Sequence, residues 1–424
     1  MRSIHRGWMI LIFISLGVLA CLGFGRFSLG AIIPFMKIGL ELDYSQTGLI
    51  ASSVFLGYLI SAVSVGHFVL HYRAKKVIVF SMGIIIIGMV LSGLSTGFWS
   101  ALFGCFLTGI GSGGVYVPSL GLLGEWFSRE KKGMAMGVAM SGSGMGIVFS
   151  GLVIPNLVGT ENDGWRWSWY ILAILVLIIL CINAIGLRNH PSEWSLLPVG
   201  EKQNRVKKSI EEKEIVTSKK ASVEVYKNKQ IWLYGLNYFG WGFSYIIFST
   251  FLVDYLIYDV HFSKTMAGYY FALAGIVSIP SGFIWGSISD KFGRMITLTF
   301  VFMIQFVSLL SLSLLKNSIL LILTIVIYSL TLWAVPTIMN ASVSDFVKAP
   351  YVPVAMGFIT LFFSMGQFIS PAIVGQLLDV YKNYFIPFLV SSVVTLLSGI
   401  GCYQLHRQKQ SNQPKYKDGN YSTL

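Results

Sequence analysis

The chain has 424 residues, of which 54% are hydrophobic and only 12% are charged, and its mean hydropathy is +0.70. Soluble chains carry about 25% charged residues, so this composition excludes a soluble domain and indicates an all-α polytopic membrane protein. The formal net charge of +13 would suit a nucleic-acid-binding protein, but the basic residues gather in alternate loops, which indicates membrane topology instead. We therefore expect the lipid bilayer, and no nucleic acid, as a partner.

The first apolar stretch, 8–35, contains a single charge, Arg26, between glycines at 23, 25 and 30. It is too long for a signal peptide and has no small-residue cleavage site, so we interpret it as a retained membrane-spanning helix closed by Pro34. Arg26 lies about 27 Å along this helix from Trp8, at about 1.5 Å per residue, too deep to reach back to the starting side.

A charge at this depth costs roughly 2.5–3.5 kcal/mol to insert, and ionisable residues inside a membrane are functional by default. We expect the Arg26 guanidinium to face an internal polar cavity and to hold an anion. The alternative is an arginine paired, for packing, with a carboxylate or with helix-end carbonyls.

Eleven more apolar stretches follow, and each is long enough to cross a bilayer. A long polar gap separates two sets of six. The expected spans are 8–35, 46–70, 75–96, 99–124, 132–157 and 166–187, then 230–257, 264–289, 295–315, 318–343, 351–378 and 383–405. We therefore expect a first half at 1–187, a cytoplasmic linker at 188–229 with a short surface helix over 211–220, a second half at 230–405 and a cytoplasmic tail at 406–424.

Lysine and arginine residues set the expected orientation, because they collect on the cytoplasmic side of membrane proteins. One side receives Arg2, Arg6, Arg73, Lys75, Lys76, Arg129, Lys131, Lys132, Lys291, Arg294, Lys348, the linker and the tail. The other side receives only Lys37, Arg166, Lys264, Lys316 and Lys382. We expect both termini in the cytoplasm and the protein in the plasma (cytoplasmic) membrane.

The four cysteines all fall inside apolar stretches and show no Cys-x-x-Cys spacing: Cys21, Cys105, Cys181 and Cys402. We expect buried free thiols rather than disulfides or metal ligands. Because no clustered catalytic or metal-binding set stands out, we expect neither an enzyme nor a cofactor.

The two halves repeat at an offset of 220 residues. The matches are Gly66 with Gly286, Ala135-Met136-Gly137 with Ala355-Met356-Gly357, and Gly146 with Gly366. Two parallel six-span halves joined by a linker are typical of a rocking transporter with its site between the halves.

The turn between the eighth and ninth spans has the order Gly-x-x-x-Asp-x-x-Gly-Arg, formed by Gly286, Asp290, Gly293 and Arg294. Here the chain resembles the major facilitator superfamily, whose signature loop has this form. The resemblance implies twelve transmembrane helices in two six-helix halves, and a loop that latches the cytoplasmic side in the outward-facing state. The alternative is an ordinary interfacial charge cluster that holds topology.

The matching loop of the first half keeps Gly66 and a basic end at Arg73, but Leu70 stands where the family has its acidic residue. We include Gly66 and Arg73 in the expected gating latch, although its acidic member is missing from this half. His67 and His71 have the i, i+4 spacing of a proton relay, but we interpret both as polar residues at a cytoplasmic helix end.

The motif order of the first half resembles the YbfB/YjiJ-like branch of the superfamily. The motifs are Gly25-Arg26-Phe27 with Pro34, then Gln46 to Ser52, Gly57-Tyr58-Leu59, and Gly164 to Trp169. Spans four and five are also similar to oxalate/formate and monocarboxylate carriers. Those carriers have a key arginine in span eight, and residues 262–289 contain none. If a carboxylate binds, Arg26 must take that role.

We interpret the chain as a secondary active transporter of a small organic anion that works by alternating access, and we expect a monomer. Candidate partners of Arg26 in the substrate site are Tyr58, Tyr116, Tyr245, Trp333 and Gln367, with packing as the equal alternative for the aromatic residues. A co-transported proton stays open as a partner, because no aspartate or glutamate lies at mid-membrane.

Two other functions were weighed against anion transport. Efflux of hydrophobic compounds or drugs is the main alternative, and the lone buried cation argues against it. So does span five, where Ser150-Gly151 and Ile154-Pro155 replace the signature of drug–proton antiporters. A membrane sensor on the same fold would be expected to carry a soluble domain larger than the linker or the tail.

Overall fold

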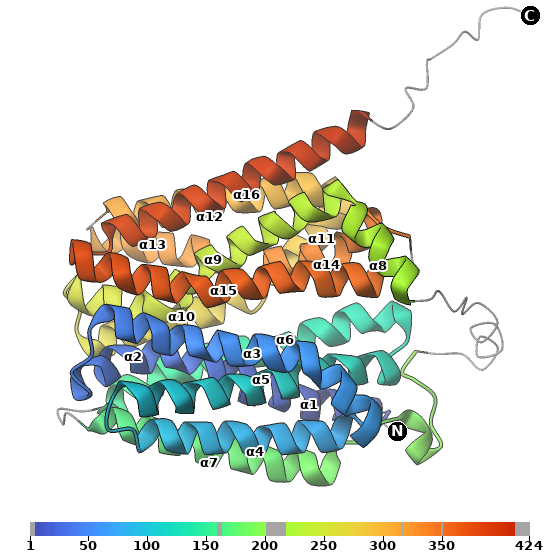
Figure 1. Cartoon of the computed structure of the whole chain (residues 1–424), viewed down its shortest axis with the longest axis horizontal. Coiled ribbons are helices and arrows are strands. Elements are labelled where there is room, and N and C mark those ends of the chain that lie inside the picture. The colour runs from blue at the N-terminus through green and yellow to red at the C-terminus, as the bar shows by residue number, and fades with distance from the viewer. Residues whose placement is uncertain (1–4, 159–162, 201–217, 316, 349–350, 412–424) are drawn as a thin grey trace, which may run out of the picture.

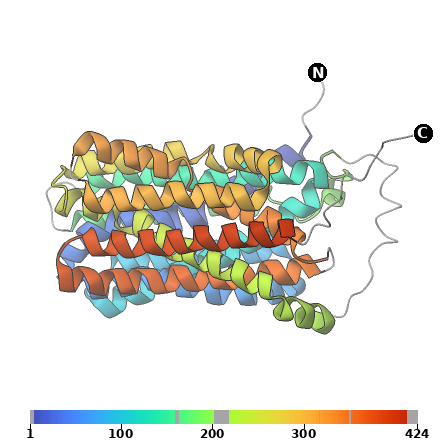
Figure 2. The ribbon, with the colours of Figure 1, turned by 90° about the horizontal axis from the view of Figure 1, so that it is seen from above.

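Twelve helices of the computed structural model are long and apolar enough to cross a membrane, among residues 5–158, 163–200, 218–315, 317–348 and 351–411, which the structure describes. The helices run lengthwise between two ends of the molecule (Figures 1 and 2). The fold is therefore the all-α, twelve-helix membrane fold that the hydropathy predicted.

The first half contains six membrane-spanning segments, of which the first is compound. The elements are α1 (Gly7–Val18), the π-helix η1 (Leu19–Phe27), α2 (Ser28–Gly39), α3 (Tyr44–Tyr72), α4 (Ala74–Gly93), α5 (Phe98–Trp126), α6 (Arg129–Val158) and α7 (Gly164–Gly186). The first segment was expected to close at Pro34. That expectation is wrong, because Pro34 lies inside α2 and the helix continues to Gly39.

The second half also contains six segments, two of which are broken. The elements are α9 (Lys229–Tyr258), α10 (Lys264–Ser278), α11 (Ser281–Phe292), α12 (Arg294–Leu314), α13 (Ser318–Ser329), α14 (Ala334–Ser342), the 3-10 turn η4 (Val343–Asp345), α15 (Val352–Tyr381) and α16 (Phe385–Ser411). The breaks fall between α10 and α11 and between α13 and α14. Hydropathy does not reveal them, because the apolar character continues across each break.

The 220-residue repeat recurs in the packing of the two halves. A Cβ on Gly146 of α6 would collide with Gly23 of η1, and a Cβ on Gly366 of α15 would collide with the backbone of α9 at Phe243. Gly23 and Phe243 are themselves separated by the same offset. Each half therefore uses a glycine of its fifth segment to bring that segment into backbone contact with its first.

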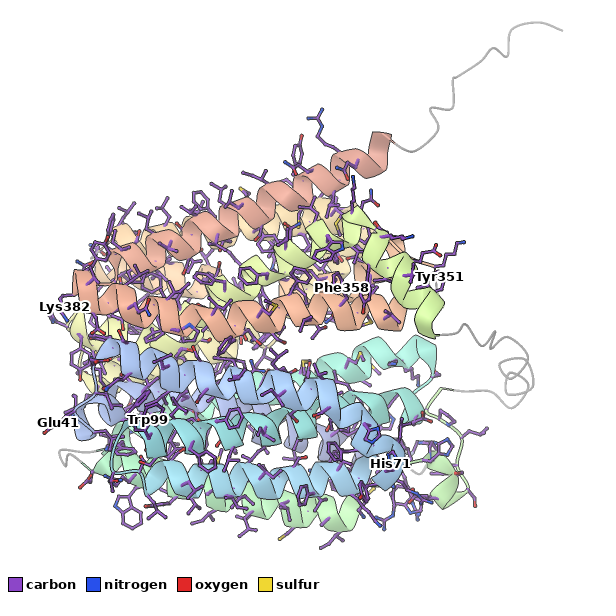
Figure 3. The ribbon with its side chains drawn as sticks, viewed as in Figure 1. Glu41, His71, Trp99, Tyr351, Phe358 and Lys382 are labelled. Atoms are coloured by element: carbon purple, nitrogen blue, oxygen red, sulfur yellow. The ribbon has the colours of Figure 1, made fainter. Side chains whose placement is uncertain are left out.

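The two halves form two layers, with α1–α7 in the lower layer of Figure 1 and α9–α16 in the upper. Glu41, Trp99 and Lys382 lie at one end, called here the far end (Figure 3). His71 and Tyr351 lie at the opposite end, called here the basic end (Figure 3). The ribbons of α3 and α15 lie close at the far end and diverge toward the basic end (Figure 1).

Residues 188–200 of the expected linker fold back onto the first half. Val199 forms a parallel bridge with Phe127, its N–H donates to the Trp126 carbonyl at 2.8 Å, and its carbonyl accepts from the Ser128 N–H at 3.1 Å. The short 3-10 helix η2 (Pro191–Trp194) lies in this return. The first part of the linker is therefore a strap on the first half.

A short helix does occur later in the linker, α8 (Ser218–Lys227). It packs against the second half, where Tyr226 lies 5.1 Å from Phe358 between ring centroids. The surface helix expected over 211–220 overlaps α8 at three residues, and its part over 211–217 lies outside the described residues.

All four cysteines are free, and Cys21, Cys105 and Cys402 are buried as expected. The expectation of burial is wrong for Cys181, which is exposed on α7. Only 33% of the most apolar window of α7 is buried inside the protein, so this helix presents most of its surface outward, where a membrane would cover it.

Candidate functional site

The site begins with a distortion of the first membrane segment. At the end of η1 the N–H of Ser28 bonds to the carbonyl of Gly23, five residues back, which is the π-helical pattern. Ser112 of α5 donates to the Cys21 carbonyl at 2.9 Å and so supports the widened turn from outside. Single π-helical turns inside α-helices occur frequently at functional sites. Arg26 lies in this turn.

The Arg26 side chain is buried, with 6% of its surface exposed. Its Nε and Nη2 atoms are buried and have no hydrogen-bond partner among the described residues. No carboxylate in the described part of the chain forms an ion pair with it. Instead the guanidinium carbon lies 4.4 Å from the ring centroid of Tyr58 and 4.8 Å from that of Phe55.

These two rings support the guanidinium, but its Nε and Nη2 donors have no hydrogen-bond partner in the described structure. Cation–π contacts of this kind contribute roughly 0.5–2 kcal/mol, with the larger values at desolvated sites. Removing a charge from water costs several kcal/mol, even after relaxation. The Arg26 site is therefore incompletely compensated by the protein alone, and its unpaired donors suit a carboxylate or another anion.

Of the candidate tyrosines, Tyr58 lies against the guanidinium and Tyr116 lies next to Tyr58. The rings of Tyr58 on α3 and Tyr116 on α5 are 6.3 Å apart between centroids. The Tyr116 hydroxyl donates to the Met140 sulfur at 3.6 Å. The first half thus contributes one cation and two phenols to a common region.

The second half contributes Tyr245 of α9 and Gln367 of α15. Gln367 Nε2 donates to the Tyr245 hydroxyl, while Gln367 Oε1 is buried and has no partner in the described structure. Both residues are at most 1% exposed. A Cβ on Gly30 of α2, one turn after Arg26, would collide with the Ser249 carbonyl of α9, one turn after Tyr245. The amide–hydroxyl pair and the guanidinium therefore lie where the two halves meet.

Tyr245 is held in place by stacked aromatic rings. Trp241, one turn earlier on α9, stacks on Tyr245 with 4.4 Å between centroids and 12° between planes. Phe363 of α15 stacks on Trp241 at 5.2 Å. Offset stacking of this kind fixes ring orientation and contributes about 0.5–1.5 kcal/mol per pair beyond burial.

Trp333, the remaining candidate, lies at the break between α13 and α14. Its Nε1 donates to Ser278 Oγ at 3.2 Å and its backbone N–H donates to Ser281 Oγ at 3.1 Å. Its ring lies 5.6 Å from that of Phe27, the neighbour of Arg26 in η1. The indole N–H is thus already used, and Trp333 contributes its ring face.

The structure therefore brings Arg26, Tyr58, Tyr116, Tyr245 and Gln367 into one cluster and places Trp333 against its edge through Phe27. The sequence reasoning missed Phe55 and Trp241. Both carried a signal, since Phe55 precedes Tyr58 by three residues and Trp241 precedes Tyr245 by four. These spacings put each pair on one helix face.

A second set of polar contacts joins the halves at the far end. Asp379 of α15 accepts hydrogen bonds from the N–H groups of Tyr44 and Ser45 at 3.1 and 2.7 Å, and from Ser45 Oγ at 2.5 Å. It thereby caps the N-terminus of α3, where a negative charge is favoured. Lys37 of α2 lies 3.7 Å from the buried Asp254 of α9. We call these contacts the far-end lock.

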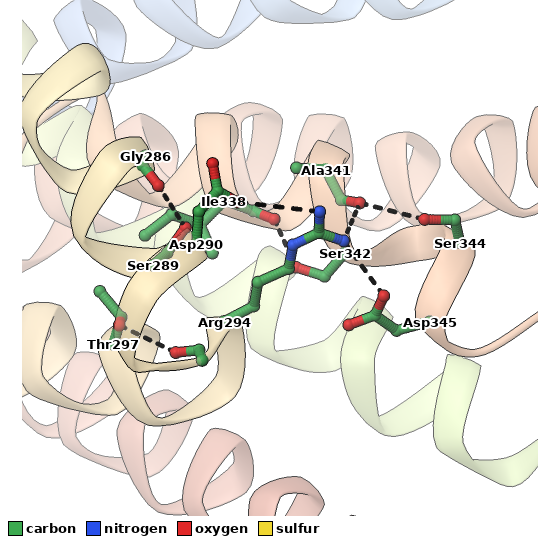
Figure 4. A network of polar contacts seen from close by, with 11 residues as sticks. Gly286, Ser289, Asp290, Arg294, Thr297, Ile338, Ala341, Ser342, Ser344 and Asp345 are labelled. Atoms are coloured by element: carbon green, nitrogen blue, oxygen red, sulfur yellow. Dashed lines mark hydrogen bonds and ion pairs between the residues drawn. The ribbon is translucent and has the colours of Figure 1, made fainter.

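The expected latch of the second half lies at the basic end and contacts its own half (Figure 4). Arg294 Nη1 donates to the Ala341 carbonyl at 2.7 Å and to Asp345 Oδ1 at 3.1 Å, and Arg294 Nη2 lies 3.9 Å from Asp290 Oδ1. Within the described structure, a Cβ on Gly286 would meet Thr337 of α14, at 3.3 Å, and nothing else within 4 Å. These contacts join α11 and α12 to the end of the tenth segment.

The corresponding loop of the first half is open. Gly66 is exposed, and a Cβ placed on it would meet nothing within 4 Å in the described structure. Arg73 has φ 63° and ψ 149°, and Gly293, which is 220 residues later, has φ 97° and ψ 139°. Both loops thus make the same turn, and the first half makes it with a residue for which this conformation is strained.

Comparison with known proteins identifies the family of the chain. The family model described as Major Facilitator Superfamily matches residues 16–371. Among curated proteins, the chain is 26% identical to monocarboxylate transporter 12-B of Danio rerio, over 88% of this chain and 82% of that protein. It is 22% identical to a probable sulfoacetate transporter of Cupriavidus necator, over 89% and 88% of the two chains. It is 23% identical to the nitrite extrusion protein of Bacillus subtilis, over 87% of each.

Solved structures share the fold. A bacterial homologue of the human lysosomal transporter Spinster, in an inward-facing and unoccupied conformation, has a TM-score of 0.76 and 15% identity, and covers 96% of this chain and 98% of its own. A D-xylose–proton symporter has a TM-score of 0.74 and 13% identity, over 94% of this chain and 97% of its own.

Proposed function

Because the chain belongs to the major facilitator superfamily, a family of transporters and not of enzymes, we propose that it is a secondary active transporter of a small organic anion. The substrate would bind between the two halves and cross the membrane by alternating access. The finer placement in the YbfB/YjiJ-like branch stays part of this proposal.

The observation that carries the proposal is the unpaired guanidinium of Arg26. Its Nε and Nη2 atoms are buried without a partner among the described residues, at the place where η1 departs from α-helical geometry. An arginine that served packing alone would be expected to satisfy these donors with a carboxylate or with carbonyls. A carboxylate offers the geometry that a planar guanidinium binds with two hydrogen bonds.

The relatives support the sign of the substrate charge. The names of three of them specify monocarboxylate, sulfoacetate and nitrite, which are all anions. Efflux of hydrophobic cations or drugs is the alternative, and a buried, unpaired arginine would repel a cation. No observation on the described residues favours that alternative.

The arrangement of contacts supports a conformation that is closed at the far end. The far-end lock joins the halves there, while the latch of Arg294, Asp290 and Asp345 lies wholly in the second half. The basic end is rich in lysine and arginine, so we place it in the cytoplasm together with both termini. This state would then face inward, with the protein a monomer in the cytoplasmic membrane.

Counterflow in proteoliposomes tests the proposal. Purified protein is reconstituted with an unlabelled carboxylate inside, and entry of the labelled compound is followed for a panel of short monocarboxylates, sulfonates and quaternary ammonium ions. We expect exchange of at least one anion and of no cation. Exchange restricted to cations or neutral drugs would replace the proposal with the efflux alternative.

A further inference from the structure

The unpaired end of the Gln367 amide lies on the second-half side of the same cluster as Arg26. Like the indole Nε1 of Trp241 beside it, it is a buried polar group that the described residues leave unsatisfied. One end of the amide bonds to the Tyr245 hydroxyl and the other, Oε1, has no partner in the described structure. Gln367 is fully buried. A buried polar atom without a partner costs about as much as a lost hydrogen bond, so this end is expected to meet a group from the substrate.

The chemistry of the pair limits what that group can be. A tyrosine hydroxyl both donates and accepts, so it can bind either end of an amide, and the two ends exchange by a half-turn of the side chain. The free end therefore requires a substrate group that can donate to Oε1 or accept from Nε2. A hydroxyl does both, a keto oxygen can only accept, and a methylene can do neither.

The position of the pair relates this second group to the first. Arg26 comes from the first half, and Tyr245 and Gln367 come from the second. A Cβ on Gly30, one helical turn after Arg26, would collide with the Ser249 carbonyl, one turn after Tyr245, so the two helices are in backbone contact next to both residues. A substrate with a carboxylate on Arg26 and a hydroxyl on Gln367 would join the two halves. A neutral polyol would leave the guanidinium without a counter-charge, and an unsubstituted fatty acid would leave the amide unpaired.

We propose that the substrate is a hydroxy acid, with its carboxylate on Arg26 and a hydroxyl on the free end of the Gln367 amide. This inference rests on the proposed anion transport and adds the second recognition group to it. The stacked rings of Trp241 and Phe363 hold Tyr245, and through it the amide, in a fixed orientation. Gln367 is therefore the residue that sets specificity among carboxylates.

Counterflow with matched compounds tests the inference. Within each set, the compounds differ in the group next to the carboxylate: none, a carbonyl or a hydroxyl. The two-carbon set is acetate, glyoxylate and glycolate, and the three-carbon set is propionate, pyruvate and lactate. Gluconate adds hydroxyls at a greater distance from the carboxylate. We expect the hydroxylated member to exceed the unsubstituted member by about 10-fold or more, because a site built for a hydroxyl rejects the analogue that lacks it. A wild-type protein that exchanges acetate and propionate as well as every hydroxylated compound would overturn the inference.

The variant Gln367→Leu removes the amide at similar size and should bring the ratio of hydroxylated to unsubstituted exchange close to one. Gln305→Leu is the matched control. Gln305 is a buried amide on α12, and its Nε2 already bonds at 3.1 Å to the carbonyl of Thr331, in the break between α13 and α14. It should keep the wild-type ratio. A folded Gln367→Leu protein that keeps the wild-type ratio would also overturn the inference.

Folding of each variant is checked by size-exclusion chromatography and thermal unfolding in detergent. If Gln367→Leu does not fold, Gln367→Asn is tested in its place. The shorter side chain moves the amide away from the substrate, so the ratio of hydroxylated to unsubstituted exchange should fall. An unchanged ratio would contradict the inference. Absence of exchange for every carboxylate and sulfonate in the wild type is a different result. It would contradict the proposed anion transport itself, and therefore also the inference that rests on it.

Discussion

At the scale of single residues, Arg26 is the group that the fold leaves least compensated. Two aromatic rings cover the guanidinium, and two of its nitrogens have no acceptor in the described structure. Pairing with a carboxylate or with helix-end carbonyls, for packing, is the alternative interpretation of the same residue. The described residues provide no such carboxylate, so the two interpretations now differ in what removal of the side chain should do to stability.

Arg26→Ala should leave the thermal stability of the empty protein unchanged or raise it, because no buried partner loses its counter-charge. Arg166→Ala is the matched control: its guanidinium is tied to the Gly93 and Ser95 carbonyls at 2.9 and 2.5 Å and to Asp163 at 2.8 Å, so its loss should lower stability. Thermal unfolding in detergent measures both. A loss of about 3–5 kcal/mol on Arg26→Ala would indicate a paired, structural arginine.

Arg73 gives a second prediction at this scale. Its backbone, at φ 63° and ψ 149°, lies close to a region that is essentially reserved for glycine, at a cost of about 1–3 kcal/mol. Arg73→Gly should relieve this strain and stabilise the protein by roughly 0.5–2 kcal/mol, after the entropy that glycine loses on folding. Arg73→Ala removes the charge and keeps the strain, so it should not stabilise. Equal melting temperatures for the two variants would contradict the strain argument.

At the scale of elements, the far-end lock joins α3 to α15 and α2 to α9 across the two halves. Asp379 holds Ser45 through two hydrogen bonds to one carboxylate oxygen. Asp379→Asn should weaken this contact and raise the population of the conformation open at the far end. Spin labels at Glu41 and at Tyr381, the exposed last residue of α15, should move apart, since these positions lie at the far end in opposite halves. Lys382 is kept, because its Nζ lies 3.8 Å from Asp379 Oδ1.

Asp43→Asn is the matched control for that experiment. Asp43 lies at the same end and caps α3, but it bonds to Gln46 within its own half, so its loss of charge should not change the distance between labels. An equal change in both variants would mean that charge at the far end, and not the Asp379 contact, controls opening.

The latch at the basic end gives a prediction for the opposite transition. Asp290 is exposed, and among the described residues its ion-pair partner is Arg294 of the same half. Asp290→Asn should slow turnover and leave substrate affinity similar, because the residue belongs to the latch at the basic end, where it pairs with Arg294 and not with a residue of the Arg26 cluster. Initial rates of counterflow and binding affinity would be measured on the same preparation. A large loss of affinity at equal protein level would contradict the latch role.

At the scale of the whole molecule, the twelve spans and the two halves could be predicted from the sequence. The length of each apolar stretch predicts a span, and the repeat at an offset of 220 residues predicts two similar halves. The expected limits 8–35 and 383–405 agree with Gly7–Gly39 and Phe385–Gln408 within a few residues. The breaks inside three segments could not be predicted in this way. The turn of η1, for example, depends on Ser112 of another helix, which only the folded chain brings into contact.

The candidate site was predictable to a similar degree. Arg26 could be identified because it is a charge inside an apolar span. Tyr245 and Gln367 could each be predicted as site residues because they lie near the middle of their spans. Their mutual hydrogen bond, and the far-end pairing of Lys37 with Asp254, depend on how α9 meets α15 and α2. No local pattern carries that information, since each pair is separated by more than 100 residues.

The measurement that tests the central claim most directly is carboxylate exchange by wild-type, Arg26→Lys and Arg26→Ala proteins in liposomes, with folding checked in parallel. Lysine keeps the charge and loses the two-pronged geometry, so Arg26→Lys should exchange the anion with lower affinity. Arg26→Ala should fold and show no exchange of the anion. A folded Arg26→Ala protein that exchanges the carboxylate as the wild type does would show that the substrate binds elsewhere.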